Sequence, residues 1–206
     1  MALVDLPLQQ LLSRFSSSDP TPGGGSASAL ASATGASLLT MVAGLQKTRN
    51  QSDDDRAALG AAAAALDGIR RRLTEAIDAD TAAYNEVVGA YKLPKATSEE
   101  QGARQAAIQR ALQAATDVPL GVMKQSVRAL EEATVVAAHG YKSAASDVGV
   151  AIALLTAGAT GAKLNVDVNI EAITDAAYRT EAGADSRDLL ETIGTIAERA
   201  KALLRN

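Results

Sequence analysis

Apolar residues recur at intervals of three and four along most of this chain, which is the spacing of one face of an α-helix. Strict alternation of apolar and polar residues, the mark of a half-buried strand, is missing. Helix-start signals divide the pattern: Ser52 precedes three aspartates, and Thr97 stands three residues before Glu100, as in a capping box. The pattern predicts an all-α protein, a compact bundle of about six or seven helices.

Cap and breaker residues set the expected helix limits. We expect Ser146 or Asp147 to cap the helix that follows it, and Pro119 to kink a long helix rather than end it. The expected helices cover residues 3–15, 25–45, 52–91, 97–139, 146–161, 165–180 and 185–204. Neither a linker nor an internal repeat interrupts them, so residues 1–206 are expected to form a single domain.

Composition supports this class and argues against others. With 20 basic and 24 acidic residues, the net charge of −4 disfavours a general nucleic-acid binder, which needs a basic face. Without cysteine and with a single histidine, neither a disulfide nor a metal site is expected. The first residues lack the features of a signal peptide, and the longest uncharged run, Val148–Ala162, is shorter than a membrane span. We therefore expect a cytoplasmic protein with no membrane partner.

The segment Asp19–Ser26, which reads DPTPGGGS, leads directly into a long series of small and apolar residues. A phosphate loop would need a lysine after its last glycine, and a dinucleotide fingerprint would need a glycine at position 28 and a preceding strand. Neither is present. Glycines at a helix start leave N–H donors bare near a positive dipole end, where a carboxylate, a carbonyl or a flat heterocycle could bind. The alternative is that the glycines only let another helix pack closely.

A carboxylate interrupts the apolar stripe of the helix expected over residues 52–91. Because burying an ionised carboxylate is costly, Asp80 should either favour its protonated form or meet a cationic group. Either arrangement suits a general acid or base, and the alternative is a structural aspartate hydrogen-bonded to a neighbouring helix. Asp78 and Glu86 lie off the stripe and are expected to be solvated. The stripe consists of Leu66, Ile69, Leu73, Ile77, Asp80, Tyr84, Val87 and Tyr91.

Other polar residues stand in apolar surroundings. Asp147 is placed where helix capping is its expected role. Asn165 and Asn169 are four residues apart on one helix face, where their amides either bind the edge of a heterocycle or tie two helices together. Lys47, near the end of the glycine-led helix, is a candidate contact for an anionic ligand tail. His139 precedes Gly140 at a predicted helix end, which favours a structural role.

The residues TPGGGSASALASATGASLLTMVAGL, Thr21–Leu45, resemble the opening signature of the formiminotransferase-cyclodeaminase C-terminal family. The resemblance covers essentially the whole chain. Its further matches are Asp80–Val87 (DTAAYNEV), Val118–Leu120 (VPL), Ser146–Ala151 (SDVGVA), Asn165–Ile170 (NVDVNI) and Thr174–Asp175.

This resemblance implies an all-helical homodimer that holds a tetrahydrofolate derivative at the glycine-rich entry, with no further cofactor. The family's catalytic aspartate falls on Asp80, which would act as general acid and base. The activity would be that of a cyclodeaminase, which releases ammonia and forms methenyltetrahydrofolate, or of a cyclohydrolase, which forms formyltetrahydrofolate. The implied substrate-binding residues are Thr21, Gly23, Gly24, Gly25, Ser26, Lys47, Asp147, Asn165 and Asn169.

Two segments, 46–50 and 141–145, differ from the usual sequence of that family. Both are expected to border the pocket. They favour an alternative function, in which a non-catalytic helical homodimer binds a folate or another heterocycle.

Overall fold

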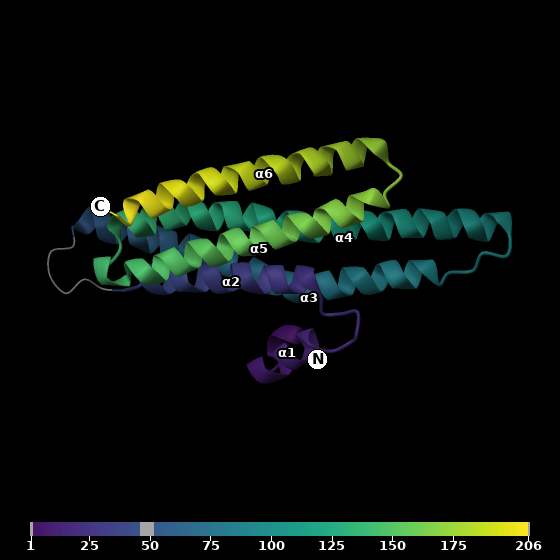
Figure 1. Ribbon diagram of the computed structural model, residues 1–206, viewed down its shortest axis with the longest axis horizontal. Helices are drawn as coiled ribbons and strands as arrows, with labels where there is room; N and C mark the ends of the chain where they lie inside the picture. The colour runs from purple at the N-terminus through teal and green to yellow at the C-terminus, as the bar shows by residue number, and fades with distance from the viewer. Residues whose placement is uncertain (1, 46–51, 206) are drawn as a thin grey trace.

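The computed structural model describes residues 2–45 and 52–205, and within them the architecture is all-α (Figure 1). The predicted class and number of helices are confirmed in the described residues, which contain six α-helices and two short 3-10 helices. The α-helices are α1 (Leu8–Phe15), α2 (Gly24–Ala43), α3 (Asp53–Tyr91), α4 (Ser98–His139), α5 (Ala145–Glu171) and α6 (Ala176–Leu203); the 3-10 helices are η1 (Leu3–Asp5) and η2 (Lys142–Ala144).

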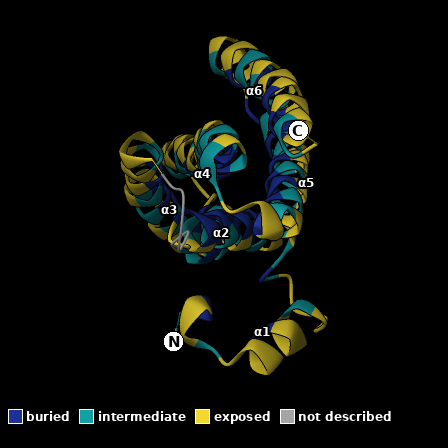
Figure 2. Cartoon of the chain, turned by 90° about the vertical axis from the view of Figure 1, so that its left-hand side faces the viewer, coloured by how far each residue is buried: buried dark blue, intermediate teal, exposed yellow. Residues whose placement is uncertain are grey.

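The helices α2 to α5 form the body of the bundle, and α6 packs on α4 and α5 (Figures 1 and 2). α2 lies between α3 and α5. The long helices α3 and α4 form a hairpin that extends beyond the start of α2 (Figure 1). This arrangement leaves the first turn of α2 facing α3 near Asp80, in the C-terminal part of that helix.

The N-terminal segment differs from the single helix expected over residues 3–15. Pro7, which has no N–H to donate, separates η1 from α1, and α1 lies below α2 in both views, with Leu11 buried (Figures 1 and 2). The carboxylate of Asp78 holds η1, because it accepts the backbone N–H groups of Leu3 and Val4 at 2.6 and 3.3 Å. The expectation that Asp78 is merely solvated was therefore wrong.

The limits predicted for the two longest helices are confirmed. The side chain of Ser52 accepts the backbone N–H of Asp55 at 3.0 Å, and Thr97 forms its capping box with Glu100. α4 continues through Pro119 instead of ending there. These helices begin and end as predicted because their cap signals are local in sequence.

The limits predicted for the C-terminal helices were wrong, because α5 is uninterrupted from Ala145 to Glu171. Gly158 and Gly161 do not break it. A β-carbon at either position would collide with Ser28 or Ser32 of α2, so these glycines allow α2 and α5 to approach closely.

The starts of α5 and α6 also differ from the prediction. The N-cap of α5 is Ala144, which has no side-chain hydrogen bond, so neither Ser146 nor Asp147 caps the helix. α6 begins near residue 176 rather than 185, because the carboxylate of Asp175 accepts the N–H groups of Ala177 and Tyr178.

Two segments, Gly24–Ala43 and Lys142–Glu171, are long and apolar enough to cross a membrane by length and composition alone. The second exceeds the run of residues 148–162 on which the sequence expectation was based. Both are packed into the bundle as α2 and as η2 with α5.

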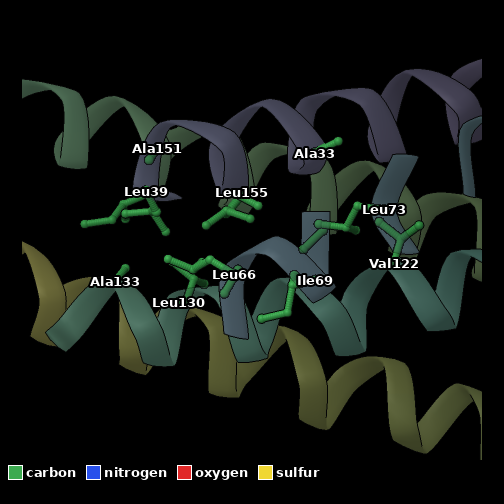
Figure 3. Packing of buried hydrophobic residues seen from close by; sticks show 14 of the residues in the cluster. Ala33, Leu39, Leu66, Ile69, Leu73, Val122, Leu130, Ala133, Ala151 and Leu155 are labelled. Atoms are coloured by element: carbon green, nitrogen blue, oxygen red, sulfur yellow. The ribbon is translucent and has the colours of Figure 1, made fainter. Parts of the chain in front are cut away.

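Buried apolar side chains form two clusters. The larger one includes residues of all six α-helices, and Figure 3 shows part of it, with Leu39, Leu66, Leu130 and Leu155 among its members. The smaller cluster lies toward the far end of the α3–α4 hairpin and consists of Ala90, Ile108, Ala111, Leu112 and Ile173. The start of α2 contacts α3 between these two clusters.

Candidate active site

The start of α2 meets α3 at Asp80. Gly23 occupies the N-cap position of α2 and has no side chain that could bind the free N–H groups of the first turn. Asp80 supplies the missing acceptor: its Oδ2 accepts the backbone N–H of Ser26 at 2.8 Å and the Ser26 hydroxyl at 3.0 Å. The carboxylate thus caps α2 from a neighbouring helix, at the positive end of the helix dipole.

Gly25 leaves the space that this contact requires. A β-carbon at position 25 would overlap the carboxyl group of Asp80, so only glycine fits beside it. Gly24 is different, because a β-carbon there would lie 3.7 Å from Nδ2 of Asn165, an ordinary contact distance, and the residue is exposed. Gly25 therefore makes room for Asp80, and Gly24, the residue before it, leaves its backbone exposed.

Ser26 is fully buried, and its hydroxyl faces α3. The oxygen lies 2.8 Å from the carbonyl oxygen of Ile77, 3.0 Å from Oδ2 of Asp80 and 3.3 Å from the hydroxyl of Thr81. A side chain enclosed in this way holds Asp80 instead of contacting a ligand directly. The resemblance to the family had implied that Ser26 binds the substrate. The local sequence could not show otherwise, because it does not reveal which helix the hydroxyl faces.

The second oxygen of Asp80, Oδ1, accepts no hydrogen bond from the described residues, and the side chain is half-buried. None of the ion pairs between described residues involves Asp80, so the cationic partner considered from sequence is missing from that part of the chain. The bonds to Ser26 match the structural role, and the unoccupied oxygen suits an acid–base role. One carboxyl group can serve both, because each role uses a different oxygen.

Beyond Asp80 the buried stripe of α3 changes face. Tyr84 and Tyr91, which were expected on the buried side, are exposed, and Ala83 and Ala90 are buried instead. The change follows from where α2 begins. Its first turn lies at Asp80, so α2 does not cover the part of α3 beyond Asp80, which buries the side that faces the smaller cluster.

Asn165 lies beside the first turn of α2. Its Nδ2 donates to the carbonyl of Gly161 in its own helix at 2.8 Å and is the atom nearest to Gly24. The amide oxygen accepts no hydrogen bond from the described residues and is a candidate acceptor for a ligand N–H. Its position supports the predicted binding role.

Asn169 lies one turn after Asn165 in α5, and its side chain has a partner in α4. Pro119 has no N–H, so the carbonyl of Ala115, four residues earlier in α4, lacks its helical donor. The Nδ2 of Asn169 donates to that carbonyl at 2.8 Å. Asn169 therefore ties α5 to α4 at the proline, the second of the two roles considered from sequence.

The other predicted binding residues are more scattered. Thr21 is half-buried and is separated from the glycines by Pro22. Asp147 lies in the first turn of α5, about 27 Å along the helix from Asn165, so within one chain it is remote from Asp80. Lys47 and the divergent segment 46–50 lie outside the described residues.

Fold and site together define an all-helical protein that presents a half-buried carboxyl group, held by a second helix, at an open helix start. The family model described as Formiminotransferase-cyclodeaminase matches residues 7–188 of this chain. The chain is 40% identical to the methenyltetrahydrofolate cyclohydrolase of Methylorubrum extorquens, over 93% of this chain and 92% of that protein. It is 33% identical to the formimidoyltransferase-cyclodeaminase of Rattus norvegicus, over 95% of this chain but 36% of the longer relative.

The fold also matches a crystal structure. That structure is the formiminotetrahydrofolate cyclodeaminase of Thermotoga maritima, with a TM-score of 0.86 and 26% identity, and the match covers 98% of this chain and 96% of that one. The chain belongs to the formiminotransferase-cyclodeaminase family. The resemblance noted in the sequence is confirmed.

Proposed function

We propose that the protein is a folate one-carbon enzyme in which Asp80 acts as general acid and base. The observation that carries the proposal is the Asp80 carboxyl group, whose Oδ2 is held by Ser26 and whose Oδ1 lies against Gly25 and accepts no hydrogen bond from the described residues. The names of the relatives support the substrate class, a tetrahydrofolate derivative. The proposal includes no metal and no cofactor beyond this substrate.

The preferred reaction is the hydrolysis of methenyltetrahydrofolate, since the relative with that name matches this chain over nearly its whole length. Asp80 takes a proton from a water molecule as the water oxygen bonds to the methenyl carbon. The carboxylic acid then returns the proton to the folate nitrogen whose bond to that carbon breaks. The product is formyltetrahydrofolate, and one further proton passes to solvent.

The cyclodeaminase reaction is the second candidate, which the match to the Thermotoga maritima structure favours. Here a folate nitrogen bonds to the formimino carbon and the amino group leaves as ammonia. Asp80 would accept the proton of the attacking nitrogen and deliver a proton to the leaving nitrogen. Both reactions place positive charge near a carbon between two nitrogens, which a carboxylate stabilises.

In this proposal the folate lies at the N-terminal end of α2, where it contacts Thr21, Gly23, Gly24 and Asn165. Ser26 and Gly25 do not contact the folate but position the carboxyl group of Asp80. Asn169 holds α5 against α4. We further propose that the protein works as a cytoplasmic homodimer. The exposed apolar sides of α2 and α5 support the dimer.

Turnover measurements test the enzyme proposal. Wild type and Asp80→Asn are incubated separately with methenyl- and formiminotetrahydrofolate, and the methenyl chromophore is followed. We expect Asp80→Asn to lower kcat by about 10²- to 10⁴-fold, because it removes the proton-transferring group. Glu86→Gln, an exposed carboxyl change on the same helix, is the control and should leave kcat unchanged.

Two results would count against the proposal in different ways. If wild type accelerates neither reaction over buffer, the enzyme function fails and a non-catalytic heterocycle-binding protein is favoured. If Asp80→Asn matches wild type, the enzyme stands but the role of Asp80 fails.

A further inference from the structure

Tyr84 is an exposed aromatic residue on the side of α3 that packs against α2. Its side chain is 40% exposed. The carbonyl of Ile77 and the carboxylate of Asp80 both accept hydrogen bonds from Ser26 of α2, and Tyr84 follows these two residues by seven and four positions. Residues at these spacings lie on one face of a helix. The ring of Tyr84 therefore faces the place that one more turn at the start of α2 would fill.

The point at which α2 begins explains why this ring is exposed. An aromatic side chain at the centre of a packing face is normally buried. Here the chain enters α2 through Gly23 and Gly24, which have no side chains to cover the ring. α3 itself continues to Tyr91, and Figure 1 shows the α3–α4 hairpin running past the start of α2. Tyr84 is thus left uncovered on a face that is otherwise used for packing.

The ring of Tyr84 leans toward the carboxyl group of Asp80. The two residues are one helical turn apart, about 6 Å along α3. Side chains of a helix point toward its N-terminus, over the preceding turn, and for Tyr84 that turn contains Asp80. On the side of α2, the β-carbon that Gly24 lacks would have only Asn165 within 4 Å, at 3.7 Å. A ligand at the start of α2 would therefore meet the carboxyl group and the aromatic ring together.

The two exposed tyrosines of α3 differ in what lies over their rings. The guanidinium carbon of Arg104 lies over the ring of Tyr91, 5.4 Å from its centroid. No cation of residues 2–45 and 52–205 takes the corresponding place on Tyr84. Because the face of an aromatic ring attracts positive charge, Tyr84 offers a cation-binding surface that this part of the chain does not fill.

The charge of the proposed substrate matches this surface. In methenyltetrahydrofolate a flat ring holds the methenyl carbon between two nitrogens, and these nitrogens share one positive charge. Hydrolysis opens that ring and leaves a neutral formyl group. The substrate can therefore present a flat cation to an aromatic ring, and the product cannot.

We infer that the ring of Tyr84 stacks on the cationic ring of methenyltetrahydrofolate and makes the site bind this substrate more tightly than formyltetrahydrofolate. The carboxylate of Asp80 then meets the charge at the reacting carbon, and the tyrosine ring covers the flat face of the same group. A cation over a tyrosine ring strengthens binding by roughly 3- to 30-fold. The interaction ends when the substrate ring opens, so it favours release of the product. The identity of the ligand rests on the proposed function.

Equilibrium binding tests the inference. Methenyl- and formyltetrahydrofolate are titrated separately into an Asp80→Asn parent protein, in which conversion is blocked, and free ligand is measured after rapid ultrafiltration. The methenyl absorbance checks that the substrate remains intact. We expect the additional change Tyr84→Leu to raise the Kd for methenyltetrahydrofolate about 10-fold and that for formyltetrahydrofolate at most about 2-fold. Tyr84→Phe keeps the ring face and should stay within about 2-fold of the parent for both ligands.

Tyr91→Leu is the matched control, because it removes the other exposed tyrosine from the same stripe of α3 and should leave both Kd values unchanged. Tyr84→Gln is a second variant without an aromatic ring and should reproduce the effect of Tyr84→Leu with a polar side chain. Both substitutions place a good helix former at an exposed position, so the urea midpoint should stay at that of the parent.

The outcomes separate this inference from the proposed function. Equal weakening of both ligands by Tyr84→Leu, or unchanged binding, would overturn the inference and leave the proposed function in place. A loss in Tyr84→Phe as large as that in Tyr84→Leu would do the same, because the hydroxyl group would then be the contact. So would the same loss in Tyr91→Leu. Failure of both wild type and the parent to bind either ligand would overturn the proposed function, and this inference with it.

Discussion

At the residue scale, the contact between Ser26 and Asp80 separates a positioning role from a binding role. The hydroxyl of Ser26 is buried and hydrogen-bonds Asp80, so its removal should disturb the orientation of the carboxyl group and leave the ligand contacts in place. Hydrogen bonds to charged groups contribute about 1.5–3 kcal/mol.

We expect Ser26→Ala to lower kcat about 10- to 100-fold with little change in KM, which corresponds to the loss of one such bond. In the Asp80→Asn background the same substitution should have little further effect, because the group that it positions is already gone. Steady-state kinetics of the four variants of this cycle check the prediction. Ser32→Ala, which removes another buried serine hydroxyl of α2, is the control. Equal losses in both backgrounds, or a rise in KM alone, would contradict the positioning role.

At the scale of elements, the predictions that succeeded came from local signals. The caps at Ser52 and Thr97 lie within three residues of the groups that they bind, so the sequence shows both partners. A helix was expected to end at Gly161, because the helix that packs against this glycine lies more than 100 residues earlier in the chain and is not visible in the local sequence. Asn169 meets the carbonyl freed by Pro119 through the register of α5 on α4, which no local pattern reveals.

We expect Asn169→Ala to lower the free energy of unfolding by about 1–3 kcal/mol, because the carbonyl of Ala115 would lose its donor. In a Pro119→Ala background position 119 regains an N–H, so the same substitution should cost clearly less. Urea unfolding of the four proteins measures this coupling. Additive losses would show that Asn169 does not compensate for the proline.

At the scale of the whole molecule, a hydrogen bond between a histidine and an aspartate connects the start of α3 to the end of α4. Nδ1 of His139 lies 2.6 Å from Oδ1 of Asp55, as the helix-end position of the histidine had suggested for a structural role. This hydrogen bond holds the pKa of Asp55 below its ordinary value of 3.8. The unfolded chain therefore binds a proton at Asp55 at a higher pH than the folded chain does, and stability falls as the pH drops through that range.

We expect the urea midpoint of wild type to fall more between about pH 5 and pH 3 than that of Asp55→Asn, which lacks the titrating group. Asp54→Asn, which changes an exposed neighbour, should keep the wild-type slope. Parallel losses in wild type and Asp55→Asn would show that this pair does not contribute to acid unfolding.

For the candidate site, sequence reasoning was sufficient to single out Asp80, since a charged residue in an apolar stripe is visible without a structure. It could not show that the same carboxylate caps α2, because the crossing of two helices decides which groups meet. The resemblance had also implied that Asp147 binds the substrate, but within one chain Asp147 lies far from Asp80.

The hydroxyl of Ser26 has one proton and lies within reach of two acceptors, the carbonyl of Ile77 and the carboxyl of Asp80. When Asp80 is ionised, the hydroxyl can donate to Oδ2; when Oδ1 carries a proton, Oδ2 is a weaker acceptor and the hydroxyl can turn toward the carbonyl of Ile77. Rotation about a single C–O bond therefore accommodates both charge states, and no heavy atom has to move. A catalytic cycle built on this carboxyl group would need almost no reorganisation of the protein around it.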